Sequence, residues 1–231
     1  NNKTNYSIPQ QMRTGTTTVL NNIKKVSAGS LHTLALAENG TVYSLGYNYY
    51  GQQGITTDNV YTPRKVSILE KIIDVAVENN TIIVLDQNGE VLASGYNTYG
   101  NLGNNTTQTR KSFDKVIEKY ETITTGEGEE ETTTTTPVYL SGIKSIEAGN
   151  EYAVAIKEDG TAISWGYNGY SQSSNGTTTN NLLPVDLKYG KDKENIDKII
   201  NVSAGEGTIV VVREDGKVWT IGKNYSGQLG N

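Results

Sequence analysis

Residues 26–54 carry the pattern that decides the fold: they read VSAG at 26–29, HTLAL at 32–36, ENG at 38–40, TVYSLGYN at 41–48 and YYGQQG at 49–54. The nearly continuous apolar run at 33–37 is typical of a strand that is covered on both faces. The Asn39-Gly40 pair is a strong hairpin signal, because glycine tolerates the positive φ that such turns require. The stretch therefore predicts a strand, a tight turn, a second strand and a glycine-punctuated loop.

The same unit recurs three more times along the chain. Its turn glycines stand at 40, 89, 160 and 216, and the glycines that end its second strand stand at 46, 95, 166 and 222. Both series have spacings of 49, 71 and 56 residues, so the strand–turn–strand core keeps one length and only the connections vary. Serine replaces two loop glycines of the third copy, at Ser171 and Ser174. Self-similarity of this kind indicates a repeat architecture.

These motifs resemble the regulator-of-chromosome-condensation repeat family. The family pattern joins an Ala-Gly, an apolar strand often opened by histidine, an Asp-Gly or Asn-Gly turn, an aromatic strand ending Trp-Gly-x-Asn, and Gly-Gln-Leu-Gly. His32, WGYN at 165–168 and GQLG at 227–230 match it, and the resemblance covers essentially the whole chain. It implies an all-β propeller, which in this family typically has seven four-stranded blades. We therefore expect an all-β propeller, or a propeller segment, of about four four-stranded blades built from repeats of about 50 residues.

The repeats predict one domain over residues 1–231, divided at about 26–74, 75–145, 146–201 and 202–231. We expect residues 1–25 to complete the last repeat, because the two ends of the sequence are in phase. The last repeat could be completed in three ways: by closure of one chain into a four-bladed ring, by exchange of segments between two chains, or by a head-to-tail contact between chains. We expect residues 1–25 to pair with a neighbouring chain or with flanking repeats, which gives possible self-assembly through terminal strands.

An insertion at residues 117–139 lengthens the second repeat. Its threonines favour strands, and the GEGEE run at 126–130 separates them as a turn. The preferred interpretation is a projecting β-hairpin that pairs 117–125 with 131–139, and the alternative is a mobile acidic loop. The acidic residues Glu127, Glu129, Glu130 and Glu131 lack the spacing of a calcium loop, so a solvated turn is favoured over a metal site.

Few residues suit catalysis. His32 is the only histidine, and the matching positions hold Thr81, Tyr152 and Thr208, which favours a structural role. No Gly-x-Ser-x-Gly elbow accompanies it, and the absence of cysteine excludes disulfides and thiolate metal sites. We expect no enzymatic activity, no cofactor and no metal.

The composition narrows the partners further. The chain has 20 Lys plus Arg against 25 Asp plus Glu, which supplies no basic face for nucleic acid. No apolar run is long enough for a membrane span. Abundant Asn, Thr, Tyr and Gly are typical of exported proteins of Gram-positive bacteria, so an extracellular or cell-surface bacterial location is expected.

Tyrosine is the residue whose distribution suggests recognition. Eight of the 15 tyrosines occupy equivalent loop positions after the second strand: Tyr47, Tyr49, Tyr50, Tyr96, Tyr99, Tyr167, Tyr170 and Tyr225. Equivalent loops of a propeller emerge on one face, so these rings should form an arc suited to binding. We expect the three that directly follow the strand-end glycine to pack between blades, and we take the rest as candidate binding residues: Tyr49, Tyr50, Tyr99, Tyr170 and Tyr225.

The sequence therefore favours a non-enzymatic binding scaffold that recognises a protein, or a glycan, through one loop face. The family resemblance also implies two alternatives. One is a nucleotide-exchange factor for a small nuclear GTPase that binds chromatin. The other is an inhibitor of a secreted enzyme such as β-lactamase.

Overall fold

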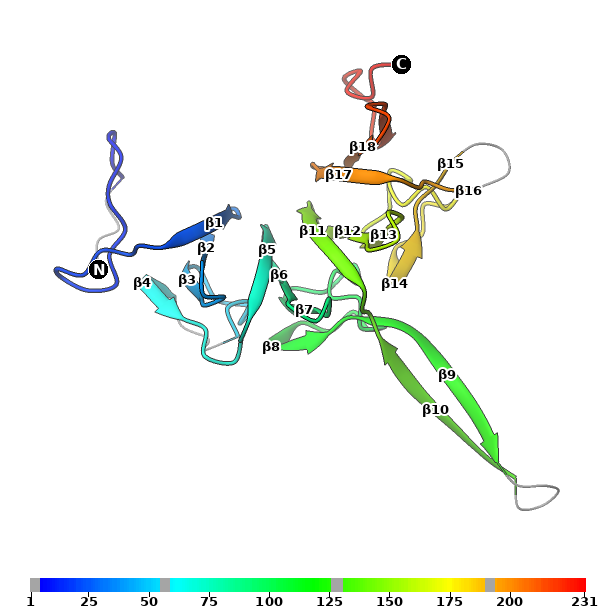
Figure 1. The fold of residues 1–231 in the computed structure, drawn as a ribbon, viewed down its shortest axis with the longest axis horizontal. Helices are drawn as coiled ribbons and strands as arrows, with labels where there is room; N and C mark the ends of the chain where they lie inside the picture. The colour runs from blue at the N-terminus through cyan, green and yellow to red at the C-terminus, as the bar shows by residue number, and fades with distance from the viewer. Residues whose placement is uncertain (1–4, 55–58, 126–130, 190–193) are drawn as a thin grey trace.

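Four antiparallel sheets stand side by side in an open arc (Figure 1). The computed structural model describes residues 5–54, 59–125, 131–189 and 194–231, and over these ranges it contains no helix and hence none that could cross a membrane. The first sheet comprises β1 (Ile23–Ala28), β2 (His32–Ala37), β3 (Val42–Gly46) and β4 (Val60–Lys65). The second comprises β5 (Ile72–Glu78), β6 (Thr81–Asp86), β7 (Val91–Gly95) and β8 (Arg110–Lys115). The third comprises β11 (Ile143–Gly149), β12 (Tyr152–Lys157), β13 (Ala162–Gly166) and β14 (Asn181–Asp186), and the fourth β17 (Ile199–Ala204), β18 (Thr208–Arg213) and β19 (Val218–Gly222). The all-β propeller-type fold expected from the sequence is confirmed.

Each sheet is a meander in which every strand pairs with the next one along the chain. The turn between β2 and β3 shows why: Gly40 has a φ of 81°, and the side chain of Asn39 accepts a hydrogen bond from the N–H of Thr41 over 3.0 Å. The turn glycines of the other three repeats also have positive φ. The predicted Asn-Gly and Asp-Gly turns are therefore present in all four repeats.

The hydrophobic core lies between neighbouring sheets. In the first interface Leu34 and Leu36 of β2 pack with Val75 of β5 and Ile82 of β6. Similar buried clusters join the second sheet to the third and the third to the fourth. A sheet in the middle of the arc is thus covered on both faces, which explains why its strands read as apolar runs rather than as alternating patterns. Each buried aliphatic side chain of this kind contributes about 1.5–3 kcal/mol.

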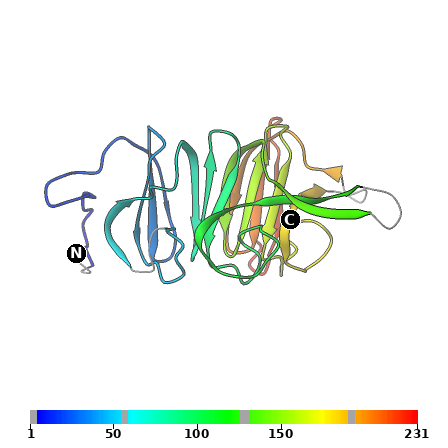
Figure 2. The same ribbon diagram turned by 90° about the horizontal axis from the view of Figure 1, so that it is seen from below.

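The insertion in the second repeat forms a hairpin that projects from the arc (Figure 2). Strand β9 (Ile117–Thr125) pairs with β10 (Thr132–Tyr139), which confirms the predicted hairpin. The hydroxyl groups of Thr122 and Thr135 are 3.0 Å apart across the pair. The predicted turn at 126–130, with most of its acidic residues, lies outside the described residues. A small two-stranded sheet, β15 (Lys188–Tyr189) with β16 (Glu194–Asn195), follows the third sheet.

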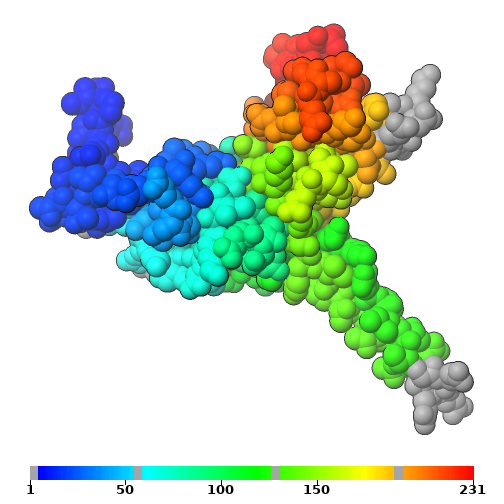
Figure 3. Space-filling view, viewed as in Figure 1, coloured from blue at the N-terminus to red at the C-terminus, as the bar shows by residue number. Residues whose placement is uncertain are grey.

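The two ends of the arc do not meet. Residues 5–22 form one isolated bridge, Arg13 with Val19, and lie apart from the fourth sheet (Figure 3). The fourth sheet accordingly has three strands where four are expected. Residues 5–22 thus add no strand to the fourth sheet within one chain. The repeat boundaries, and the pairing of residues 1–25 with another chain or with flanking repeats, stay predictions.

Candidate functional site: a tyrosine-lined face

Each repeat presents its tyrosine loop at the end of its third strand, and one backbone hydrogen bond fixes where that loop begins. In the first repeat the N–H of Tyr47 donates to the carbonyl of Leu31, in the short loop between β1 and β2, over 2.8 Å. The matching bonds are Tyr96 to Asn80 (3.1 Å), Tyr167 to Glu151 (2.8 Å) and Lys223 to Gly207 (2.9 Å). The short inner loop and the tyrosine loop of every repeat thus lie together at the same end of the sheet.

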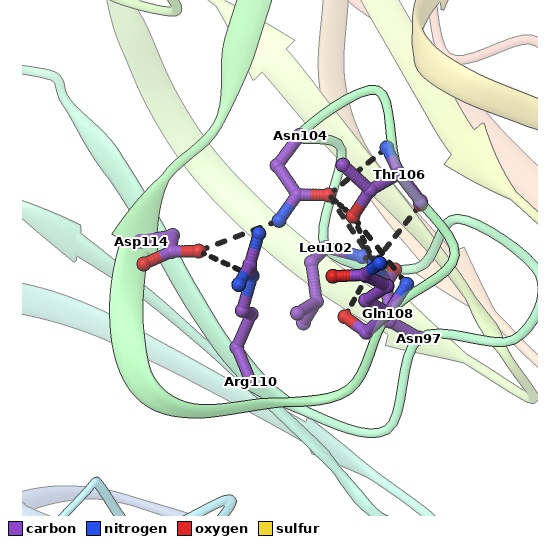
Figure 4. A network of polar contacts seen from close by, with 7 residues as sticks. All are labelled: Asn97, Leu102, Asn104, Thr106, Gln108, Arg110 and Asp114. Atoms are coloured by element: carbon purple, nitrogen blue, oxygen red, sulfur yellow. Dashed lines mark hydrogen bonds and ion pairs between the residues drawn. The ribbon is translucent and has the colours of Figure 1, made fainter.

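A single asparagine holds each tyrosine loop in shape. Its Oδ1 accepts a hydrogen bond from the N–H five residues later, in the pairs Asn48 with Gln53 (2.9 Å), Asn97 with Leu102 (2.8 Å), Asn168 with Ser173 (2.9 Å) and Asn224 with Leu229 (2.9 Å). The amide nitrogen of Asn97 also donates to the carbonyls of Thr106 and Gln108, at 2.9 and 3.1 Å (Figure 4). A buried amide with both ends satisfied makes the loop rigid, because a broken bond would leave a polar group buried without a partner.

The eight loop tyrosines form one continuous run of ring contacts, which we call the tyrosine ladder. The contacts between repeats join Tyr50 to Tyr96 at 5.3 Å between ring centroids, Tyr99 to Tyr167 at 5.2 Å and Tyr170 to Tyr225 at 5.7 Å. Within the repeats the neighbouring rings are 5.3–6.3 Å apart. Most pairs are edge-to-face, which is a favoured geometry for aromatic rings.

No ring of the ladder is buried. Tyr49 and Tyr225 are 67% and 82% exposed, and the other six are partly exposed. Tyr47, Tyr96 and Tyr167 were expected to pack between blades. Tyr167 does pack against the buried cluster between the third and fourth sheets, and all three rings also belong to the ladder, beside the candidate binding tyrosines. All five candidate binding tyrosines lie in the same ladder. That they bind a partner stays a prediction.

Polar side chains of the inner loops run along the ladder. Ser30 donates to the Oδ1 of Asn79 over 2.6 Å, and the amide nitrogen of Asn79 contacts Asn150 and, at 3.3 Å, Glu151. The amide of Asn101 donates to the other carboxylate oxygen of Glu151 over 2.6 Å. Burial raises the pKa of the Glu151 carboxyl, the two amide donors lower it in part, and the charge of Glu78 raises it further.

The fourth repeat has a lysine where the other three have a tyrosine after the strand-end glycine. The ammonium group of Lys223 lies 5.1 Å from the ring centroid of Tyr170 and 5.9 Å from that of Tyr225. It donates to a carboxylate oxygen of Glu206 over 2.8 Å, and this bond raises the pKa of Lys223. A cation therefore occupies a position in the ladder between two rings, paired with a carboxylate.

His32 is a core residue. It is 3% exposed, and neither ring nitrogen has a hydrogen-bond partner among the described residues. Burial lowers its pKa to about 4 from the usual 6.5. Because the unfolded chain takes up the proton first, acidification from pH 6.5 towards pH 4 should favour unfolding, by up to about 3 kcal/mol. Urea denaturation of the wild type across this range measures the loss.

His32→Thr is the matched control, since threonine occupies the corresponding positions 81 and 208. Carboxyl groups also titrate below pH 5, so the informative quantity is the difference between the two proteins. The wild type should lose more stability than the variant between pH 7 and pH 4. Parallel losses would show that His32 is not held neutral in the folded state.

The charged side chains that lie beside the tyrosine ladder were not predicted from the sequence. Glu151, Glu206 and Lys223 were not assigned to the ladder, because their contacts join residues of different loops. The loop asparagines had a visible signal, as they recur two positions after each strand-end glycine at 48, 97, 168 and 224. The exception at Lys223, where three repeats have tyrosine, was also visible in the sequence.

The sheets and the ladder define a class, namely propeller-type repeat proteins with a loop face rich in aromatic side chains. Two family models described as "Regulator of chromosome condensation (RCC1) repeat" match residues 23–52, 143–172 and 199–228, and residues 39–84. These ranges together cover more than half of the chain, and the chain belongs to the RCC1 repeat family.

Curated relatives and solved structures agree with this assignment. The ultraviolet-B receptor UVR8 of Arabidopsis thaliana is 29% identical over 214 residues, which are 90% of this chain and 43% of that protein. Human WBSCR16 shares the fold with a TM-score of 0.66 and 20% identity, over 90% of this chain and 49% of that one. Prp20p of Saccharomyces cerevisiae also shares the fold, with a TM-score of 0.59 and 20% identity, over 81% of this chain and 42% of that one. The chain spans less than half the length of each of these proteins.

Proposed function

We propose that this chain is a non-enzymatic binding scaffold that holds a protein partner against its tyrosine ladder. The observation that carries the proposal is the unbroken run of eight partly exposed rings across four repeats. Tyrosine offers a large contact area with a polar tip and few rotatable bonds. Contacts between neighbouring rings restrain each ring before a partner arrives, so less conformational entropy is lost on binding.

The shape of the ladder favours a protein over a small molecule. Its rings extend along four sheets instead of closing around one cavity, and each repeat adds a similar strip of surface. A solved structure of the same fold, Prp20p, was described together with its binding to Gsp1p and histones. That property belongs to Prp20p, and it illustrates that a propeller of this fold serves as a protein-binding surface.

The identity of the partner would distinguish the more specific functions expected from the sequence. We propose an extracellular or cell-surface bacterial location on composition alone, and protease shaving of intact cells, followed by peptide mass spectrometry, tests it. A captured small GTPase or histone would favour the exchange-factor alternative. A captured secreted hydrolase would favour the inhibitor alternative, and a glycan that competes with the ladder would favour glycan recognition.

Replacing Tyr50, Tyr99 and Tyr170 together by alanine should abolish partner capture without unfolding the chain. Truncation of a central aromatic anchor typically costs about 2 kcal/mol or more, so the affinity should fall by about 100-fold or more. The measurement is affinity capture from extracts of the source organism, followed by titration calorimetry with the captured protein. The cooperative thermal melt of the variant should stay close to that of the wild type, since none of the three rings is buried.

The control replaces three tyrosines that lie elsewhere and are more exposed than these, Tyr61, Tyr120 and Tyr139, at 45%, 41% and 45%. This control variant should capture the same protein as the wild type. If the ladder variant still captures the partner, or if both variants lose it equally, the ladder is not the binding face. Loss of the cooperative melt in the ladder variant would instead assign these rings to the core.

A further inference from the structure

A hollow opens in the ladder where loops of the second, third and fourth repeats meet. It is lined by Tyr99, Tyr167 and Tyr170 of the ladder and by Asn150, Glu151 and Glu206 of the inner loops. The three rings are consecutive members of the ladder, with centroid separations of 5.2 and 5.8 Å. Aromatic rings and carboxylates therefore meet at one point of the proposed binding face.

The charge of this hollow is negative. Glu206 is paired with Lys223, whereas Glu151 receives its hydrogen bonds from the neutral amides of Asn79 and Asn101. Among the described residues no lysine or arginine forms an ion pair with Glu151. The carboxylate of Glu151 thus lies beside three tyrosine rings without a cationic neighbour to balance it.

Lys223 shows that the ladder accepts a cation in this setting. Its ammonium group lies over Tyr170 and Tyr225 and contacts Glu206, next to the hollow. Ring faces attract cations through their quadrupole, and the attraction is stronger for a group withdrawn from water. The neighbouring hollow has the same kinds of group, rings and a carboxylate, and Tyr170 belongs to both.

The backbone of Glu151 adds a second indication. Its φ of 63° lies in the left-handed region, which residues other than glycine rarely adopt. A residue held in such a conformation costs of order 1–3 kcal/mol, and strain of this kind is concentrated at functional sites. Glu151 thus stands where a glycine would be less strained.

We infer that this hollow receives an arginine or lysine side chain of the protein partner, which lies over Tyr99, Tyr167 and Tyr170 and pairs with Glu151. The inference rests on the proposed function and adds the chemistry of the partner to it: a basic segment anchors on the acidic part of the ladder. A neutral aromatic or proline-rich segment would use the rings but gain nothing from the carboxylate.

A peptide titration tests this inference directly. The probes are a short glycine–serine peptide that contains two arginines and the same peptide with both arginines replaced by citrulline, which keeps the shape and removes the charge. With tyrosine rings isotopically labelled, NMR should show the arginine peptide shifting the resonances of Tyr99, Tyr167 and Tyr170. The citrulline peptide should bind at least about tenfold more weakly, and added salt should lower the affinity of the arginine peptide only.

Glu151→Gln keeps the size of the side chain and one of its two acceptor oxygens and removes the charge, so it should lower the affinity for the arginine peptide by about tenfold. Glu158→Gln is the matched control, because Glu158 is exposed in the turn at the opposite end of the same sheet. It should bind like the wild type. Equal affinity for both peptides, equal effects of both substitutions, or no shift of the three tyrosines at millimolar peptide would each overturn the inference.

These outcomes are separable from a failure of the proposed function. If the Tyr50, Tyr99 and Tyr170 variant loses the captured partner while Glu151→Gln retains full affinity for it, the ladder binds a protein but the hollow does not hold a cation. If the ladder variant retains the captured partner, the proposed function fails whatever the peptides show.

Discussion

Trp165→Ala is expected to lower the free energy of unfolding by about 3–5 kcal/mol, the usual range when a large aromatic side chain is removed from a core. Trp165 is 0% exposed and lies in the buried cluster between the second and third sheets. Its indole N–H donates to the carbonyl of Asn101 over 2.9 Å, so alanine would also leave that carbonyl without its buried partner. Urea denaturation followed by far-ultraviolet circular dichroism measures the loss.

Two control variants separate the contribution of packing from that of the hydrogen bond and of burial. Trp165→Phe keeps most of the packing and removes the N–H donor, so it should cost about 1–3 kcal/mol. Trp219→Ala changes the chain's other tryptophan, which is 36% exposed, and should cost less than either. If Trp165→Ala were no more harmful than Trp219→Ala, the second and third sheets would not be joined through this side chain.

The effect should reach the binding face. Asn101 belongs to the tyrosine loop of the second repeat, so Trp165 in the third sheet supports a loop that carries Tyr99. The Trp165→Phe variant, which should still fold, is therefore expected to loosen this loop and weaken partner capture modestly. This coupling between core and face follows from the way each sheet packs against the loop of its neighbour.

Most of the fold could be predicted from the sequence because its determinants are local. The Asn-Gly and Asp-Gly turns, the strand-end glycines and the apolar runs each lie within a few residues of the structure they specify, and they recur in phase. The hairpin of the insertion was predictable for the same reason, since runs of threonine flank a glycine-rich turn. The path of residues 5–22 could not be predicted, because within one chain they form only an isolated bridge, Arg13 with Val19, and belong to none of the sheets.

In the candidate site, too, the features set by local sequence were predictable and those set by contacts between repeats were not. The tyrosines could be found because equivalent loop positions of a propeller must lie on one face. The polar partners could not, because the hydrogen bond from Asn79 to Glu151 spans 72 residues and that from Asn101 to Glu151 spans 50. Such contacts depend on the distance and angle between neighbouring sheets, which the sequence pattern of one repeat does not contain.

The glycines that end the third strands let the tyrosine loop approach the loop between the first two strands. Gly95→Ala is therefore expected to be among the most destabilising single-methyl changes in the chain. Gly95 has a φ of 108°, and a Cβ at this position would lie 2.2 Å from the carbonyl oxygen of Asn80 and 2.6 Å from the Cβ of Gln52. The first contact is with backbone, so it is relieved only if the inner loop moves away from the tyrosine loop. Strain in φ alone costs about 1–3 kcal/mol, and the clash adds to it.

Two other glycines separate these contributions. Gly142 has a φ of 67° but nothing within 4 Å of a Cβ, so Gly142→Ala should show the backbone strain alone. Gly15 has neither a positive φ in the restricted range nor a close neighbour, so Gly15→Ala should be neutral or slightly stabilising. The expected order of destabilisation in urea is therefore Gly95→Ala, then Gly142→Ala, then Gly15→Ala.

The same variant should displace the ladder. Asn80 accepts the hydrogen bond from the N–H of Tyr96 that begins the tyrosine loop, so moving this carbonyl moves the ring that contacts Tyr50 and Tyr99. Gly95→Ala should thus weaken partner capture at temperatures where it remains folded, whereas Gly142→Ala should not. If Gly95→Ala and Gly142→Ala lost equal stability and both kept full capture, the close approach at Gly95 would not be what holds the tyrosine loop in place.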